Sequence, residues 1–130
     1  MVSLLIVSHS TQLAAGVKEF ASQVAGGEVQ IADAGGTVDG SLGTSVERIQ
    51  HALQQVVSPD GTLVLVDLGS AVLSVEMAIE SLGAARVHIS DAPLVEGAYL
   101  AALEASAADT TLERVAEAAL QARELIKVHR

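Results

Sequence analysis

The chain has 130 residues, half of them apolar but with one Tyr, one Phe and no Trp, which predicts one domain with an aliphatic core. Seven basic and 16 acidic residues give a formal net charge of −9. This charge argues against nucleic acid as a partner. It is explained either by a partner with a basic face or by a role in solubility alone. Without Cys there is no thiol chemistry, and without a membrane-length apolar run or a leader-like start we expect a cytoplasmic protein with no membrane contact.

The first part of the chain predicts a strand, a helix and a second strand. Residues 3–7 form an apolar run typical of a strand buried on both faces. A helix ending near Gly26 follows, and we expect residues 28–32 to form the second strand, with a Gly- and Asp-rich loop over residues 33–43. Four apolar residues at helical spacing predict the buried face of this helix: Leu13, Val17, Phe20 and Val24.

The second predicted helix begins at Thr44. Thr44 and Glu47 have the spacing of a capping box, in which each side chain bonds the backbone of the other residue. A turn over residues 58–61, with Pro and Gly, ends this segment. The expected buried face of this helix is Val46, Ile49, Leu53 and Val56 or Val57.

The rest of the chain continues the alternation of strands and helices. We expect strands at residues 62–66 and 86–89 and helices at residues 70–82, 96–106 and 111–128. The inward residues of the helix at 70–82 are expected to be Val72, Val75, Ile79 and Leu82. Such alternation predicts right-handed crossovers and a parallel sheet with helices on both faces. The expected architecture is an α/β three-layer sandwich, with residues 1–130 as a single domain.

Candidate catalytic residues directly follow two of the predicted strands. In an open parallel sheet, the functional crevice lies beyond the carboxyl ends of the strands. His9 follows the first strand and Asp67 the third, so they meet if those strands are neighbours. His9 is then a candidate nucleophile, with Asp67 as the acceptor that fixes its tautomer. The alternative is that His9 only caps a helix start.

Two predicted helix starts offer backbone N–H groups to an anion at the same edge. They are Gly69-Ser70-Ala71 and Gly43-Thr44-Ser45, and small residues there would let phosphoryl oxygens approach. Ordinary capping is the alternative for either one alone.

Motifs that are specific for nucleotide binding or metal binding are absent. The Gly-rich segment 35–42 has Ser41 where a phosphate-binding loop needs Lys, which argues against nucleotide binding. The histidines lack ligand spacing, so we expect no metal site. His51 and His129 are expected to be solvated, and His88 to be structural.

Four motifs in order resemble the phosphotransferase subunit of dihydroxyacetone kinase, a family related to mannose-type enzyme IIA. They are Val7-Ser8-His9-Ser10, Gly43-Thr44-Ser45, the segment from Val66 through Asp67-Leu68-Gly69-Ser70-Ala71 to Ser74, and Ala92-Pro93-Leu94-Val95-Glu96-Gly97. The resemblance covers nearly the whole chain. It implies a flavodoxin-like sheet with strand order 2-1-3-4 and, usually, a homodimer.

The resemblance also implies a function and a set of site residues. His9 would take a phosphoryl group from the histidine-containing phosphocarrier protein and pass it to ADP on the nucleotide-binding kinase subunit, which phosphorylates dihydroxyacetone on the substrate-binding subunit. Asp67 would orient His9, and no metal or other cofactor would be needed. The phosphoryl group would be bound by Ser10, Gly43, Thr44, Gly69, Ser70 and Ala71. The alternatives are a mannose-type sugar transporter subunit and an anion-binding regulatory module.

Overall fold

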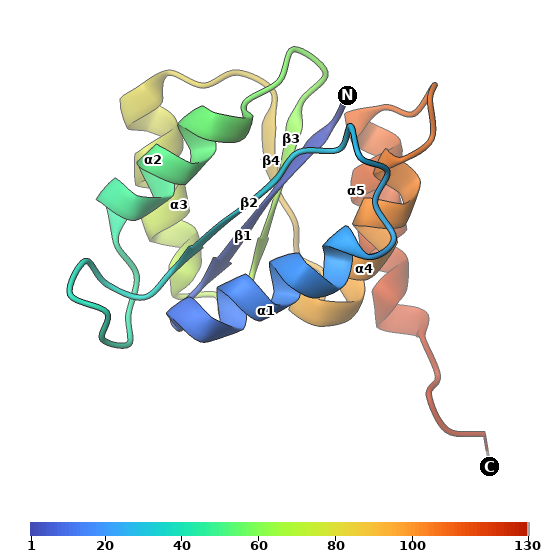
Figure 1. Ribbon diagram of the computed structural model, residues 1–130, viewed down its shortest axis with the longest axis horizontal. Coiled ribbons are helices and arrows are strands. Elements are labelled where there is room, and N and C mark those ends of the chain that lie inside the picture. The colour runs from blue at the N-terminus through green and yellow to red at the C-terminus, as the bar shows by residue number, and fades with distance from the viewer. Residues whose placement is uncertain (130) are drawn as a thin grey trace.

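A four-stranded parallel sheet forms the centre of the molecule. The computed structural model describes residues 1–129, and its strands are β1 (Ser3–Ser8), β2 (Ile31–Gly35), β3 (Thr62–Val66) and β4 (Val87–Ile89). Their order across the sheet is β2-β1-β3-β4 (Figure 1). The α/β class and the strand order 2-1-3-4 are therefore confirmed.

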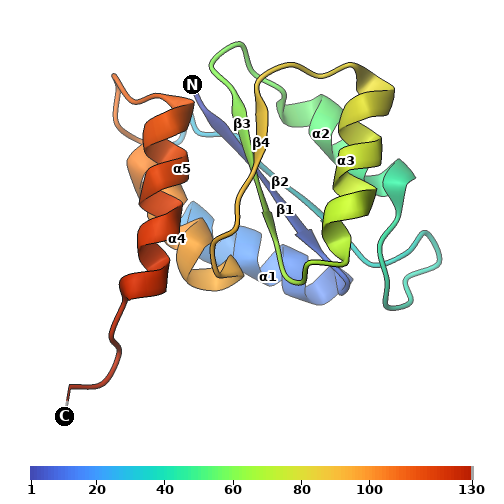
Figure 2. The same cartoon turned by 180° about the vertical axis from the view of Figure 1, so that it is seen from behind.

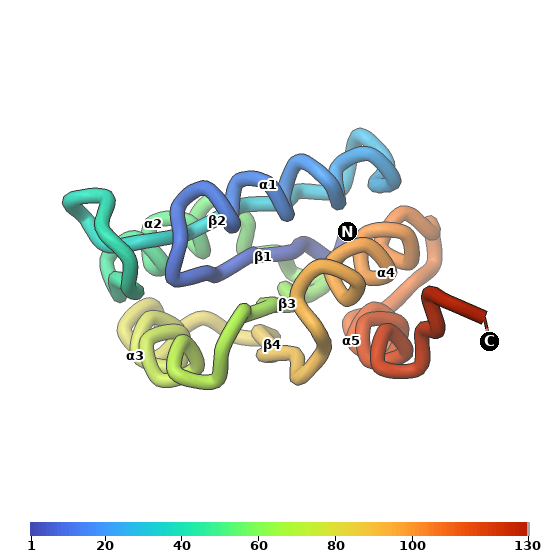
Figure 3. The backbone as a smooth tube through the Cα atoms, turned by 90° about the horizontal axis from the view of Figure 1, so that it is seen from below, coloured from blue at the N-terminus to red at the C-terminus, as the bar shows by residue number. Residues whose placement is uncertain are grey.

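Helices cover both faces of this sheet. They are α1 (Thr11–Ser22), α2 (Val46–Val56), α3 (Ala71–Leu82), α4 (Leu94–Ala105) and α5 (Leu112–Leu120), followed by the short 3-10 helix η1 (Gln121–Glu124). Figures 2 and 3 show α2 and α3 on one side of the strands and α4 and α5, with α1, on the other. No helix within residues 1–129 combines the length and the apolar character that a membrane crossing requires.

Each face of the sheet has its own apolar core. Side chains alternate along β1, so that Leu4 and Ile6 pack under α1, α4 and α5, whereas Leu5 and Val7 pack under α2 and α3. All four of these side chains are fully buried. This two-sided burial explains why β1 is a continuous apolar run, as expected for a central parallel strand.

The second strand lies three residues later than the sequence predicted. Residues 26–29 form a turn, in which the Val29 N–H donates to the carbonyl of Gly26 at 3.0 Å, and the strand begins at Ile31. The strand instead includes Asp33 and Gly35, which pair with Ile6 and Ser8 of β1. β2 is an edge strand, so the half-buried Asp33 is tolerated there although its composition is typical of a loop.

The predicted buried face of the first helix was partly wrong. Val17 is buried, but Leu13 and Phe20 are 41% and 45% exposed, and the other buried positions are Ala14 and Ala21. These small side chains let α1 lie close to the sheet, whereas the larger residues turn outward.

The start of the second helix also differs from the prediction. Ser45, not Thr44, is the N-cap, because the Ser45 hydroxyl accepts a hydrogen bond from the Arg48 N–H at 3.2 Å. The Thr44 hydroxyl lies 2.9 Å from that of Ser74 on α3, and Glu47 is exposed. The predicted buried residues Ile49, Leu53 and Val56 are confirmed, whereas Val57 is exposed.

The last predicted helix ends earlier than residue 128. The α-helix stops at Leu120, η1 ends at Glu124, and Leu125 has extended backbone. Ala122 is the last buried residue within the described chain, and Leu125, Ile126 and Val128 are exposed. Without a packed face, the intrinsic helix propensity of these few residues does not sustain further turns.

Candidate functional site

His9 and Asp67 meet at the carboxyl edge of the sheet. His9 follows β1 and Asp67 follows β3, and these strands are neighbours in which Val7 pairs with Val66. The Asp67 N–H donates to the carbonyl of Val7 at 3.2 Å, which extends the pairing to the site. The adjacency predicted from the sequence is therefore present, and it follows from the strand order.

The Asp67 carboxylate accepts four hydrogen bonds. Its Oδ1 accepts from the His9 ring nitrogen Nδ1 at 2.9 Å and from the Leu68 N–H at 2.7 Å. Its Oδ2 accepts from the Ser8 hydroxyl and from the His9 N–H, both at 2.9 Å. The carboxylate is thus fixed by backbone and side-chain donors that come from the ends of two strands.

These contacts keep Asp67 ionised. Its partial burial acts to raise its pKa, but the hydrogen bonds from His9, Ser8 and Leu68 outweigh burial and hold the pKa below the ordinary value of 3.8. An ionised carboxylate can only accept hydrogen bonds, so the His9 Nδ1 must carry the proton that points to Oδ1. In the neutral ring, Nε2 is then the nitrogen with the free lone pair.

The Nε2 atom of His9 faces the start of α3. It lies 3.0 Å from the hydroxyl of Ser70, which donates to it when the ring is neutral. Ser70 is the N-cap residue of α3, but its side chain makes no capping bond. The hydroxyl is therefore directed to the histidine and not to its own helix.

The same turn offers unused backbone donors. The N–H groups of Gly69 and Ser70 have no hydrogen-bond partner within residues 1–129, whereas the Ala71 N–H donates to the carbonyl of Leu68 at 3.0 Å. Free N–H groups at a helix start attract anions, because the helix dipole adds to their partial charges. An anion attached to Nε2 would meet the hydroxyl of Ser70 and these two amides.

The other predicted phosphate ligands already have partners. The Ser10 hydroxyl caps α1 by accepting from the Leu13 N–H, and the Ser10 N–H donates to the Ser8 hydroxyl. The Gly43 N–H donates to the carbonyl of His9 at 2.9 Å, and Gly43 has a φ of 139° that favours Gly. Thr44 is engaged with Ser74. Thus the 36–43 loop supports the backbone of His9 from the β2 side.

No role was predicted for two residues of this arrangement. Ser8 is fully buried and bonds Asp67; in the sequence it is a polar residue at the end of an apolar strand and part of the motif Val7-Ser8-His9-Ser10. At Gly35 an added Cβ would lie 2.3 Å from the carbonyl oxygen of Ser10, so only glycine lets α1 start directly over β2.

The other histidines lie elsewhere. His51 is exposed on α2 beside Gln55, His88 is exposed on β4, and His129 lies in the exposed tail. Among the residues that the structure describes, no group of three or more His, Cys, Asp or Glu side chains could hold a metal ion.

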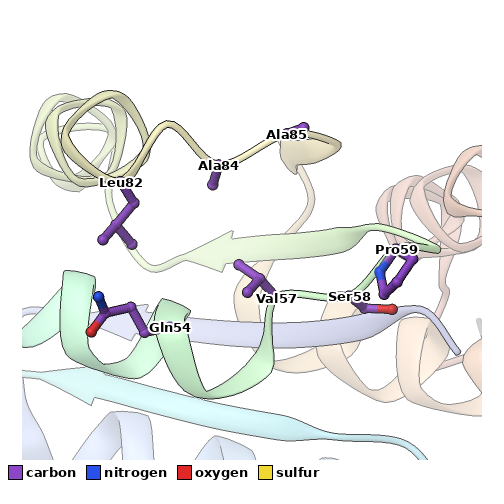
Figure 4. Close-up of a pocket in the computed structure, with 7 residues that line it drawn as sticks. All are labelled: Gln54, Val57, Ser58, Pro59, Leu82, Ala84 and Ala85. Carbon is purple, nitrogen blue, oxygen red and sulfur yellow. The ribbon is translucent and has the colours of Figure 1, made fainter.

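A separate pocket lies at the opposite end of the sheet. It has a volume of about 410 Å³ and lies between the last turns of α2 and α3, near the segments that precede β3 and β4 (Figure 4). Its lining contains no ionisable side chain: Gln54, Val57, Ser58, Pro59, Leu82, Ala84 and Ala85. This pocket therefore lacks the groups that a reactive site needs, and those groups lie around His9.

Comparisons with known proteins find relatives that are named as phosphoryl donor subunits. Residues 3–116 match the family model described as PTS system fructose IIA component. The chain is similar to phosphoryl donor subunit DhaM of PEP-dependent dihydroxyacetone kinase 2 from Listeria innocua, with 38% identity over 80% of this chain and 86% of that protein.

Further relatives include a longer protein and a solved structure. The chain is 41% identical to phosphoryl donor subunit DhaM of the PEP-dependent dihydroxyacetone kinase from Escherichia coli strain K12 over 95% of its own length, but it spans only 27% of that protein. The crystal structure of EF1359, a protein of unknown function, superposes with a TM-score of 0.77 and 37% identity, covering 92% of both chains.

Proposed function

Because this chain belongs to the family described as PTS system fructose IIA components, we propose that it carries a phosphoryl group on His9 for a PEP-dependent dihydroxyacetone kinase. Two relatives that match this chain over most of both lengths are the phosphoryl donor subunit DhaM from Listeria innocua and the phosphotransferase subunit DhaM of the PTS-dependent dihydroxyacetone kinase from Lactococcus lactis, which supports this choice within the family. The observation that carries the proposal is the ring of His9, fixed through Nδ1 by Asp67 and open through Nε2 toward Ser70.

In this proposal the donor and the acceptor are other proteins. The donor is the histidine-containing phosphocarrier protein, and the acceptor is ADP on the nucleotide-binding kinase subunit, which then phosphorylates dihydroxyacetone held by a third subunit. Residues 1–130 act as one enzyme IIA-like domain, in a cytoplasmic homodimer that needs no cofactor. Exposed Leu42 and Leu68 support contact with a protein partner, since they adjoin Gly43 and Asp67, which hold His9.

The chemistry is an in-line transfer between two nitrogen atoms. The lone pair of Nε2 attacks phosphorus, the bond from phosphorus to the donor histidine breaks, and its electron pair returns to the donor ring. Positive charge that develops on the His9 ring is stabilised by Asp67 through Nδ1–H. The transition state is loose, so alignment and electrostatic stabilisation are the main contributions of the protein.

Ser70 must turn as the phosphoryl group arrives. Its hydroxyl lies 3.0 Å from Nε2, where the new bond forms. Rotation about χ1 would let it donate to a phosphoryl oxygen, while the free amides of Gly69 and Ser70 bind the others. Of the six residues predicted to bind phosphate, Gly69 and Ser70 are therefore the two that would contact the phosphoryl oxygens.

The direct test is the intact mass of the protein after incubation with phosphoenolpyruvate, enzyme I and the phosphocarrier protein. We expect a gain of one acid-labile phosphoryl group, which disappears when the kinase subunits and ADP are added. A gain that the kinase subunits cannot remove would favour the sugar-transporter alternative. No gain at all would overturn the proposal and favour the anion-binding module.

Removing the Ser70 hydroxyl is expected to slow transfer without abolishing it. A hydrogen bond to a charged group contributes about 1.5–3 kcal/mol, so Ser70→Ala should reduce the phosphorylation rate by roughly ten- to a hundredfold. Rapid-quench measurement of phosphorylated protein gives this rate. Ser74→Ala is the matched control, because its hydroxyl lies one turn later on α3 and contacts Thr44. An equal loss in both variants would contradict a specific role for Ser70.

A further inference from the structure

Ser8 lies behind the His9–Asp67 pair and is not used in the transfer described above. It is the last residue of β1, and its side chain is fully buried. Its hydroxyl donates to Oδ2 of Asp67 at 2.9 Å and accepts the N–H of Ser10 at 3.0 Å. One hydroxyl thus connects the carboxylate to the backbone on the far side of His9.

The two bonds of Ser8 enclose His9 within a short loop. Ser8 and Ser10 flank His9 in the chain, and the His9 N–H also donates to Oδ2 of Asp67. The orientation of the carboxylate about its χ2 angle therefore depends on the Ser8 hydroxyl and the His9 N–H at Oδ2, and on the Leu68 N–H at Oδ1. That orientation places Oδ1 2.9 Å from the His9 Nδ1.

We propose that Ser8 is a positioning residue that holds the Asp67 carboxylate so that the His9 ring keeps its proton on Nδ1 and its lone pair on Nε2. Ser8 does not touch the reacting atoms; it acts through Asp67. Only a hydroxyl at this position can donate to the carboxylate and accept the Ser10 N–H with the same atom. The inference rests on the proposed function for its effect on transfer, but the tautomer it predicts is a property of the free protein.

Loss of this hydroxyl has a defined consequence. In Ser8→Ala, Oδ2 retains only the His9 N–H, and the partly buried Ser10 N–H loses its acceptor. The carboxylate can then rotate about χ2, and the hydrogen bond from the His9 Nδ1–H to Oδ1 weakens. Other acceptors can then compete for the ring proton. We expect more of the ring to carry its proton on Nε2, the tautomer that cannot attack phosphorus.

The experiment compares Ser8→Ala with Ser3→Ala. Ser3 is also a buried serine of β1, 1% exposed, but lies at the other end of the strand, where its hydroxyl bonds the carbonyl of Val56 and the hydroxyl of Thr62. Both variants lose a buried hydroxyl and some stability, and only one loses a contact to the site. Ser8→Thr keeps the hydroxyl and is the rescue variant.

Two readouts are needed for each protein. The first is the pair of ¹⁵N chemical shifts of the His9 ring, which separates the two tautomers without any partner protein. The second is the initial rate of phosphorylation by the phosphocarrier protein. For Ser8→Ala we expect shifts that move toward the Nε2–H form and a rate about tenfold lower, the effect of losing one hydrogen bond to a charged group. Ser3→Ala should match the wild type in both, and Ser8→Thr should recover most of the rate.

The outcomes distinguish the inference from the function on which it rests. Unchanged ring shifts in a folded Ser8→Ala protein would overturn the positioning role, as would an equal loss of rate in Ser3→Ala. If Ser8→Ala does not fold, Ser8→Thr decides, because failure to retain wild-type ring shifts with the hydroxyl present contradicts the inference. If the wild type takes no phosphoryl group, the proposed function fails, and the ring shifts still test Ser8.

Discussion

Replacement of His9 by Ala is expected to abolish phosphoryl transfer, with no acid-labile mass gain at any incubation time. The covalent intermediate needs a nucleophilic nitrogen, and no other group at this edge can replace it. Asp67 contacts the ring through Oδ1, while Ser70 provides only an unactivated hydroxyl. Because the group that forms the bond is removed, the effect should exceed that of any other single change in the site.

The fold should survive this substitution. The His9 side chain is about a quarter exposed, and Asp67 keeps its hydrogen bonds from Ser8 and from the N–H groups of His9 and Leu68. A loss of about 1–3 kcal/mol in the free energy of unfolding is expected, which denaturant titration would measure. The circular dichroism spectrum should be that of the wild type.

The exposed histidines provide the control for chemical specificity. His51→Ala and His88→Ala remove rings that lie on α2 and β4, away from Asp67. Both variants should take up the phosphoryl group at the wild-type rate. A phosphorylated His9→Ala protein, or an unphosphorylated His51→Ala protein, would show that another residue is the carrier.

The strand order explains why the proximity of His9 and Asp67 could be expected from the sequence. β3 was predicted with its observed bounds, and the position of Asp67 directly after it follows from those bounds. His9 could likewise be placed after the central apolar run, although β1 extends one residue further than predicted. In a parallel sheet, the ends of neighbouring strands converge, so His9 and Asp67 meet because β1 and β3 are neighbours, an order that the family resemblance implied and the residue pattern alone left open.

Other features depend on tertiary contacts that a local pattern does not contain. β2 includes Asp33 and Gly35, which are typical of loops, because pairing with β1 outweighs their low strand propensity. The sequence predicted Thr44 as the cap of α2 through its spacing to Glu47, but Thr44 contacts Ser74 on α3, and Ser45 takes the capping role. Likewise, Gly43 supports the His9 backbone with an N–H that the sequence suggested for phosphate.

Asp67→Asn is expected to slow phosphoryl transfer by on the order of 10²- to 10⁴-fold while the fold is retained, as for an amide that replaces the carboxylate of a catalytic triad. All four partners of Asp67 are hydrogen-bond donors. An amide has one acceptor oxygen and one NH₂ group, so in either orientation its NH₂ faces two donors. If NH₂ faces the His9 ring, it favours the tautomer with the proton on Nε2, which has no lone pair for attack. The initial rate of phosphorylation measures the effect, and a rate equal to that of the wild type would remove Asp67 from the mechanism.

The same substitution should change how stability depends on pH. The folded-state pKa of Asp67 lies below 3.8, so the carboxylate stabilises the fold above that pH, and this contribution is lost as the pH falls through the folded-state pKa. Asn does not titrate. Consequently the wild type should be the more stable protein near neutral pH, and the difference from Asp67→Asn should shrink as the pH falls below about 3.8. Denaturant titrations at a series of pH values test this; a constant difference across that range would mean that the hydrogen bonds around Asp67 do not favour its ionised form.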